Sequence, residues 1–378
     1  MGEQAALYQS PLVLPTRGLS FCRMAITEGK RTRRRRLVVV LLVLAGVLVI
    51  ALFLAGAFGA ATISLPDIFK MALNKLTFLD VPATWKVAEE TILFQIRLPR
   101  VVGAMLVGAA LATAGVLFQG LLRNPMADPY IIGTSAGAAL GATIAMVLPV
   151  SMAFLGFGLV PLAAFAGALG AVFIVYNLAR VGGKTPMVSM LLAGFVVSAL
   201  LAAIISFMMA ISDRLDLNIR SVYSFLMGHV SVVGWEQIVV IAPLVVGGVV
   251  IARVFAYHLN AFALGEEGAA YVGIEVERDK VLILAVGSLL TAAAVSIGGL
   301  IGFVGLVMPH AVRLALGPDH RLLVPAAALA GAAFVVLADL LARVVLAPAE
   351  IPVGIITAIV GAPFFLYLLR RSRREYAF

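Results

Sequence analysis

The chain has 378 residues, of which 62% are hydrophobic and only 12% are charged. A soluble domain carries about 25% charged residues, so a single water-exposed globule is excluded and lipid must cover the apolar excess. The net charge of +9 lies at the two ends, because residues 1–36 hold eight basic and two acidic residues and residues 370–378 hold four basic and one acidic; basic ends beside apolar segments are typical of cytoplasmic flanks, which excludes a nucleic-acid groove.

Cofactor and enzyme chemistry have little support in the sequence. Cys22 is the one cysteine, which excludes an intrachain disulfide and a cysteine-based metal cluster. The four histidines show no metal-ligand spacing, and no paired-aspartate motif or serine elbow is present. Gly182 to Thr185 (GGKT) resembles the end of a phosphate-binding loop, but Leu178 stands where that loop needs a glycine. We therefore expect no cofactor, no metal, no ATP site and no catalytic residues.

The chain begins with a basic extension, residues 1–36, which we expect to be cytoplasmic and disordered. Leu37 to Gly59 follows as 23 residues without a charge, about 34 Å of helix at 1.5 Å per residue and enough to cross a bilayer. Arg33 to Arg36 place the start of this span in the cytoplasm. A polar stretch from Thr62 to Gln95 then lies outside.

Nine further apolar segments follow the first span. Each is long enough to cross or nearly cross a bilayer, and their approximate bounds are 98–120, 129–148, 152–179, 187–211, 236–257, 281–298, 301–317, 322–346 and 352–369. The sequence thus predicts an all-α polytopic membrane protein with about ten transmembrane helices, forming a domain over residues 37–370. The loops expected inside are richer in Arg and Lys than those outside, so both termini, including the basic tail 371–378, should be cytoplasmic.

Small residues and a weak repeat indicate how the helices pack. Small side chains recur every four residues at Gly133, Gly137 and Gly141, and again at Ala104, Gly108 and Ala112, which favours close helix approach in lipid. Val107 to Leu121 matches Val286 to Leu300 at seven of fifteen positions with a constant offset of 179. Because the two copies lie on spans of opposite direction, they indicate an inverted internal repeat.

Residues 259–280 form the longest cytoplasmic loop, and they predict a short helix that contacts another protein. Gly265 precedes Glu266 and Glu267, two acidic residues that favour a helix start, and Gly273 makes a plausible stop. A helix lying on lipid would carry basic residues, whereas this one is acidic. A protein partner is the better interpretation.

Two pairs of ionisable residues allow a structural and a functional interpretation. His310 and Arg313 are expected to be structural or interfacial rather than a proton relay. Asp339 and Arg343 lie four residues apart, so they can pair on one face of a helix. Ionisable residues near a membrane are functional candidates, and a pair satisfied within the chain at the outer rim is the equal alternative.

Four stretches carry a resemblance to a known family. They are, in chain order, RLPR at 97–100, RNPMADP with GTSAG at 123–137, GFVGLVMPH at 302–310 and DLLARVVLAPAEIPVGIITAIVG at 339–361. In this order and spacing they resemble the permease subunits of ATP-binding-cassette (ABC) importers for iron-siderophores, haem and cobalamin. The resemblance covers roughly residues 60–370 and implies the type II importer permease fold.

The resemblance also implies partners and a location. The expected assembly is a homodimer in the cell inner membrane, with two ATPase subunits on the cytoplasmic side and a periplasmic or lipid-anchored binding protein outside, in contact with lipid and not with nucleic acid. Alternating access would be driven by ATP in the partner subunits. Ranked by how widely each cargo occurs in the family, the expected cargo is an iron-siderophore first, haem second and cobalamin third. The main alternative is an ion-coupled secondary transporter that works without an ATPase.

Three sets of residues take roles from the resemblance. Arg97, Arg100 and Arg343 match outer-surface arginines that dock the binding protein, a task that suits bidentate pairing with carboxylates. The ATPase coupling segment is Leu264, Gly265, Glu266, Glu267, Gly268, Ala269, Ala270 and Gly273. The cytoplasmic gate is Asn124, Pro125 and Met126 on one side, with Met187 and Val188 on the other.

Overall fold

The computed structural model describes residues 16–59, 63–76, 85–150, 152–215 and 218–372. Apart from a two-stranded hairpin (β1 Ala153–Phe154, β2 Phe157–Gly158), the regular elements of these residues are helices. They are α1 Thr16–Ala57, α2 Leu65–Leu76, α3 Val87–Thr91, the π-helical turn η1 Ile92–Arg97, α4 Leu98–Leu121, η2 Pro129–Ile132, α5 Thr134–Val147, α6 Leu159–Ala179, α7 Met187–Ala210, η3 Ser212–Arg214, α8 Ile219–Leu226, α9 Trp235–Phe262, α10 Glu266–Tyr271, α11 Val276–Gly298, α12 Val304–Leu316, α13 His320–Val344 and α14 Val353–Ser372.

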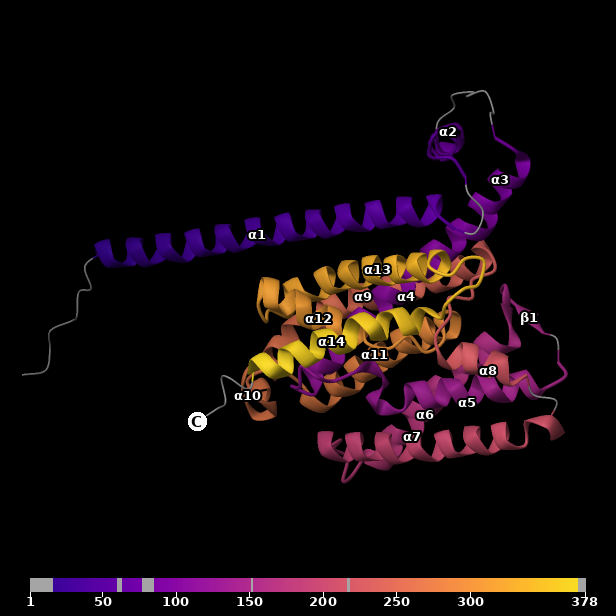
Figure 1. Cartoon of the computed structure of the whole chain (residues 1–378). Coiled ribbons are helices and arrows are strands. Elements are labelled where there is room, and N and C mark those ends of the chain that lie inside the picture. The colour runs from indigo at the N-terminus through magenta and orange to yellow at the C-terminus, as the bar shows by residue number, and fades with distance from the viewer. Residues whose placement is uncertain (1–15, 60–62, 77–84, 151, 216–217, 373–378) are drawn as a thin grey trace, which may run out of the picture.

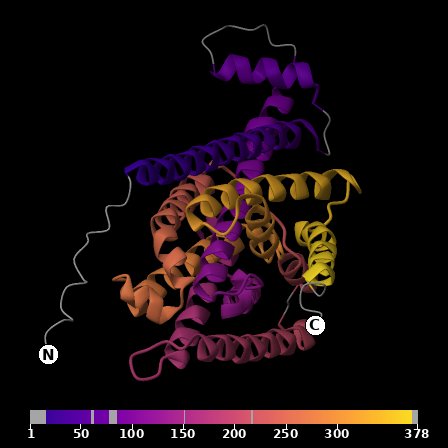
Figure 2. The ribbon, with the colours of Figure 1, turned by 90° about the vertical axis from the view of Figure 1, so that its left-hand side faces the viewer.

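The helices form a bundle around α4, which Figure 2 shows near the middle of the ring of helices. In the most apolar stretch of α4, 83% of residues are buried, against 6% for α1. α4 and the Leu37–Ala57 part of α1 are apolar all round, so these stretches are stable only when neighbouring helices or lipid cover them. α4, α11 and α13 are mostly covered by protein, whereas α1, α6, α7 and α9 leave apolar faces uncovered for lipid.

One end of the bundle gathers both ends of the described chain. Figure 1 shows the start of α1, the short helix α10 and the end of α14 at the same end, with α2, α3 and β1 at the other. A chain that enters and leaves at one end crosses the bundle an even number of times. We call these the α10 end and the opposite end.

The small residues mark the closest helix crossings, as the sequence predicted for most of them. A Cβ on Gly108 of α4 would lie 2.1 Å from the carbonyl oxygen of Gly331 on α13, and one on Gly137 of α5 would lie 2.3 Å from that of Gly167 on α6. Backbone therefore meets backbone at both crossings. Gly133 serves another purpose: its φ of +86° lets the chain turn from η2 into α5.

The two repeat copies lie on neighbouring antiparallel helices. Cβ atoms added to Gly287 and Gly298 of α11 would meet Phe118 and Val107 of α4, at 2.8 and 3.2 Å, so one helix rises as the other descends. Each copy leads into a short helix, α5 or α12, that begins after a residue with positive φ. The stretches before these helices meet where Tyr130 donates a hydrogen bond to Ile301 O at 3.2 Å, which is the arrangement of an inverted repeat.

Among the described residues, seven helices are long and apolar enough to cross a membrane, and three shorter apolar helices fall on the remaining expected spans. α5 and α12 are shorter than expected because residues 129–132 form the 3-10 turn η2 and residues 299–303 are not helical. The total of ten crossings stays a prediction.

The structure has residues 16–36 as the first part of helix α1, and residues 1–15 lie outside the described residues, so the expected disorder of the extension stays a prediction. Extending a formed helix adds one hydrogen bond per residue without a new nucleation cost, and the Arg- and Lys-rich segment is composed of good helix formers. The predicted cytoplasmic tail 371–378 overlaps the end of α14, which continues to Ser372. Residues 373–378 lie outside the described residues.

Candidate functional site

Two of the predicted docking arginines fasten the end of α1 at the opposite end of the bundle. Arg97 donates to the carbonyl oxygens of Gly56 and Ala57 at 3.2 and 3.1 Å. Arg343 donates to those of Ala55 and Phe58 at 3.2 and 3.5 Å. The last carbonyls of a helix have no partner within it and carry partial negative charge. The two guanidinium groups supply that partner.

Asp339 joins the third arginine to this cluster. Its carboxylate is almost fully buried between Arg100, with Nη2 3.0 Å from Oδ1, and Arg343, with Nε 2.9 Å from Oδ2. Arg100 also pairs with Glu350 at 3.0 Å. Pairing on both oxygens offsets the cost of burying the carboxylate. The expected Asp339–Arg343 pair is confirmed, and it belongs to a network that ties α4, α13 and the segment before α14.

The geometry separates the three arginines as docking candidates. They gather at one end of the bundle, but the side chains of Arg97 and Arg343 are buried and bonded to α1. Arg100 keeps 15% of its side chain exposed and Glu350 keeps 36%. Arg100 and Glu350 are therefore the accessible part of the cluster in this conformation.

The predicted coupling segment forms the expected short helix, α10, at the other end. Its limits agree with the sequence, because Gly265 and Gly273 adopt φ of +95° and +85° on either side of Glu266–Tyr271. The Ala269 side chain is buried against the bundle. Apolar side chains point outward around it: Leu264, Tyr271 and Val272 are 69%, 90% and 53% exposed.

Lys280 holds the start of α10 against α11. Its Nζ lies 2.7 Å from Glu266 Oε2 and 2.9 Å from Glu277 Oε1, while the Lys280 side chain is only 5% exposed. Glu266 is thus engaged within the chain, whereas Glu267 is exposed. The acidic surface available to a partner is smaller than the sequence suggests.

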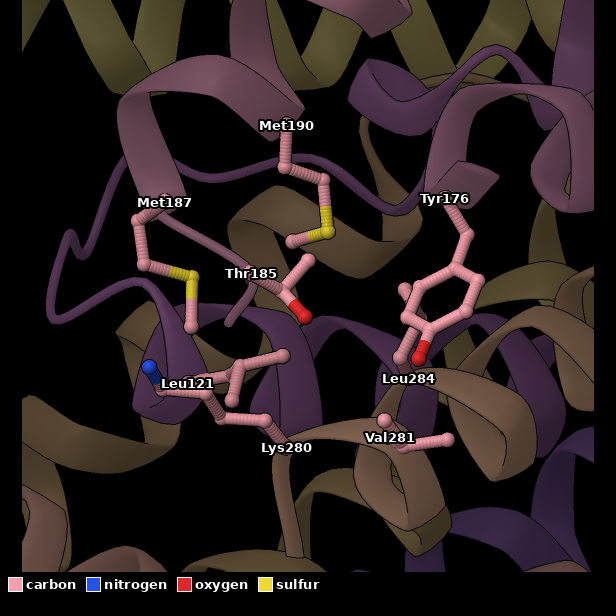
Figure 3. Close-up of a pocket in the computed structure, with 8 residues that line it drawn as sticks. All are labelled: Leu121, Tyr176, Thr185, Met187, Met190, Lys280, Val281 and Leu284. Carbon is pink, nitrogen blue, oxygen red and sulfur yellow. The ribbon is translucent and has the colours of Figure 1, made fainter. Parts of the chain in front are cut away.

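The predicted gate residues occupy the turn after α4 and the start of α7. Asn124 Oδ1 accepts a hydrogen bond from the Met126 amide at 2.9 Å, and Asn124, Pro125 and Met126 are all exposed. Met187 and Val188 begin α7, with Val188 exposed and Met187 half-buried. Met187 reaches a shallow pocket, which Figure 3 shows with Met190 beside it.

The pocket lies where the ends of four helices converge. Its lining comes from α4, the end of α6, the start of α7 and the start of α11: Leu121, Tyr176, Thr185, Met187, Met190, Lys280, Val281 and Leu284. The lining is mostly apolar, so the pocket offers no set of converging polar groups for a small ligand. Gly182 and Gly183 form a tight turn beside it, with Val181 and Lys184 bonded through their backbones.

The FecCD transport family matches residues 47–371. The chain belongs to this family. The cobalamin import system permease protein BtuC of Halobacterium salinarum is 50% identical over 290 residues, 77% of this chain and 75% of that protein. The hemin transport system permease protein HmuU of Yersinia pestis is 41% identical over 281 residues, 74% of this chain and 83% of that protein.

A solved structure shares the fold as well. It is described as an inward-facing conformation of a proposed metal-chelate type ABC transporter, and it superposes with a TM-score of 0.73 at 29% identity over 88% of this chain and 98% of that chain. This likeness confirms the all-α permease fold that the four stretches implied. All three predicted sites lie inside the FecCD match, and residues 1–46 lie outside it.

Sequence reasoning missed Lys280, Glu277 and Glu350 as members of these sites. Glu277 and Lys280 are three residues apart, a spacing at which helical side chains of opposite charge meet, so that signal was present in the sequence. Glu350 carried no such signal, because its partner Arg100 is 250 residues away.

Proposed function

We propose that this chain is the membrane-spanning permease subunit of an ABC importer for a metal chelate. It would act as a homodimer in the cell inner membrane, with both termini and α10 on the cytoplasmic side. Two separate ATPase subunits would bind at the α10 end, and a binding protein would deliver cargo at the opposite end. The FecCD membership and the permease relatives support this assignment.

The observation that carries the ATPase contact is the exposed surface of α10. Tyr271 ends α10 and Leu264 and Val272 flank it. The helix is braced by Lys280 and by the buried Ala269. An exposed apolar patch with an acidic neighbour on a braced projection is suited to a protein groove. α10 lies at the end of the bundle where the described chain begins and ends (Figure 1), and its acidic start is unsuited to a lipid surface.

Substitution of the exposed side chains tests this contact without disturbing the fold. We expect Leu264→Ser with Tyr271→Ser to reduce co-purification of the ATPase subunit at least tenfold, since apolar anchors contribute about 1–2 kcal/mol each at an interface and about 1.4 kcal/mol is a factor of ten. The matched control is Val233→Ser, which removes an equally exposed apolar side chain at the opposite end. Unchanged ATPase recovery in the double variant would remove α10 as the coupling element.

The binding protein is proposed to dock around Arg100 and Glu350. Docking on Arg97 and Arg343 as well requires their bonds to α1 to open, so those two arginines stay a prediction. Arg100→Ala should weaken capture of the binding protein from a purified pair, measured by surface plasmon resonance. An exposed arginine elsewhere on that end, Arg220, provides the control substitution Arg220→Ala.

The cargo proposed is a metal chelate, and the relatives order the candidates. The proteins at 50% and 41% identity are named for cobalamin and hemin, so these two come before the siderophores that the family resemblance placed first. Vesicles holding the purified permease with its ATPase and binding protein decide among them. Uptake of cyanocobalamin, hemin and a ferric siderophore is measured side by side.

The cytoplasmic gate is proposed to lie at the turn Asn124–Met126 and the start of α7. Its support is position: Leu121, which precedes the turn, and Met187 line the same pocket near the α10 end. Cross-linking of Met126→Cys to Val188→Cys of a second copy, in the presence and absence of ATP, tests whether these residues move relative to each other.

A further inference from the structure

The contacts beside α10 continue beyond it into another part of the chain. Lys280 Nζ bonds Glu266 of α10 and Glu277 of α11, at 2.7 and 2.9 Å. The other oxygen of Glu277 accepts a hydrogen bond from the Thr185 amide at 3.0 Å. Thr185 is buried and stands two residues before α7 begins at Met187.

This series of contacts joins two rigid pieces of chain. On one side, Gly265 O accepts from the Ala269 amide and Ala269 O accepts from the Ile274 amide, so α10 and its flanks are held as one unit. On the other side, Val181 and Lys184 exchange two backbone hydrogen bonds of 2.9 and 3.1 Å, which makes the α6–α7 turn a closed loop. A displacement of α10 can therefore be passed to the α6–α7 turn through the contacts of Glu266, Lys280 and Glu277.

Lys280 is the central member of this route because no other described cation bonds both glutamates. The neighbouring carboxylate, Asp279, is bonded by His258 of α9 instead. The neighbouring cation, Arg278, is exposed and pairs with Glu275 at 3.4 Å. The Lys280 stem also lines the pocket into which Met187 and Met190 project (Figure 3).

We infer that Lys280 is a positioning residue that transmits movement of α10 to the start of α7 through Glu277 and the Thr185 amide. The inference rests on the proposed function, in which an ATPase moves α10. Loss of the ammonium group leaves two carboxylates without their shared cation. α10 would then move without drawing the α6–α7 turn with it.

The experiment uses the complete complex with its ATPase and binding protein in vesicles. Lys280→Met removes the charge and keeps the length of the stem, Lys280→Arg restores a cation, and Arg278→Met is the matched control on the same turn. The readouts are ATP hydrolysis, cargo imported per ATP with cyanocobalamin or hemin as the probe, and the mobility of a spin label at Arg180→Cys in a Cys22→Ser background. The label reports the α6–α7 turn and is read before and after ATP with vanadate.

We expect Lys280→Met to keep ATP hydrolysis within about twofold, to lower import per ATP at least fivefold, and to abolish the nucleotide-dependent change at the label. Lys280→Arg and Arg278→Met should behave as the wild type. Wild-type import per ATP together with a wild-type label change in Lys280→Met would overturn the inference. If Lys280→Met does not assemble with its partners, Glu277→Gln is tested in its place, with import per ATP and the label change as the deciding measurements.

Failure of the proposed function and failure of the Lys280 role give different results. A wild-type chain that does not bind an ATPase contradicts the proposed function. A wild-type complex that imports cargo, with Lys280→Met equally well coupled, contradicts only the role of Lys280. The label readout with ATP and vanadate does not depend on the cargo, so it decides even if neither probe is imported.

Discussion

The arginines at the opposite end show how one residue type serves two purposes at a helix terminus. Arg97 and Arg343 place their charges on the final carbonyls of α1, which are up to 41 and 288 positions away along the chain. Such a site is favourable for a cation because the helix dipole ends there. Arg100, which bonds carboxylates instead of carbonyls, keeps part of its side chain accessible. The sequence predicted that these arginines lie near helix ends, but it did not predict which groups they bond.

Replacing Arg343 should therefore weaken the fold rather than docking alone. Arg343→Met leaves Asp339 with one cation and removes the bonds to the carbonyls of Ala55 and Phe58, and breaking a buried pair costs about 3–5 kcal/mol. We expect a clearly lower melting temperature in detergent, measured by differential scanning fluorimetry. Arg220→Met, at an exposed position of the same end, should leave the melting temperature unchanged. An Arg343→Met protein as stable as the wild type would exclude the anchoring role.

At the scale of elements, the central helices are held by backbone contact. α4 crosses α13 at Gly108 and Gly331, and it meets the start of α12 where a Cβ on Gly115 would lie 1.9 Å from Gly305 O. Lipid provides no hydrophobic drive between apolar helices, so dispersion at short separation has to supply the association. The glycines make that separation possible.

A single methyl group at the α4–α13 crossing should part the two helices. Gly108→Ala puts a Cβ 2.1 Å from a carbonyl oxygen, and overpacking of this kind costs about 1–3 kcal/mol. We expect a lower melting temperature and loss of the monodisperse peak in fluorescence-detection chromatography. Gly170→Ala on α6 is the control, because nothing lies within 4 Å of its added Cβ. Equal behaviour of the two variants would contradict the crossing.

At the scale of the whole molecule, charge is confined to the ends of the bundle. The buried ionisable side chains among the described residues belong to the first turns or the last two turns of their helices: Arg97, Asp279, Lys280, His320, Asp339 and Arg343. A secondary transporter needs ionisable groups along the path at mid-membrane. The placement of these ionisable side chains near helix ends favours transport driven by an attached ATPase.

Uptake should therefore depend on ATP and not on the proton gradient. In vesicles holding the complete complex, we expect an uncoupler to change import by less than about twofold and removal of ATP to abolish it. The permease alone, given a proton gradient and no ATPase, should show no uptake above empty vesicles. Gradient-driven uptake by the isolated chain would establish the secondary transporter instead.

The sequence alone determined the class of the protein, the approximate spans and the place of α10. These follow from local properties: apolar length, basic flanks, and glycines at 265 and 273 that end a helix wherever it lies. The four ordered stretches led to the family for the same reason, since each motif is contiguous along the chain.

Only the tertiary structure decided which partners the charged residues take. The sequence suggested that Glu266 is free acidic surface, but Glu266 pairs with Lys280. The sequence also suggested that Arg343 lies on the outer surface, but Arg343 is bonded to the end of α1. The path of residues 129–133 and 299–303 was also hidden, because two distant stretches turn aside where Tyr130 meets Ile301. Pairings of this kind depend on distances between separate helices, and a local pattern holds no information about those distances.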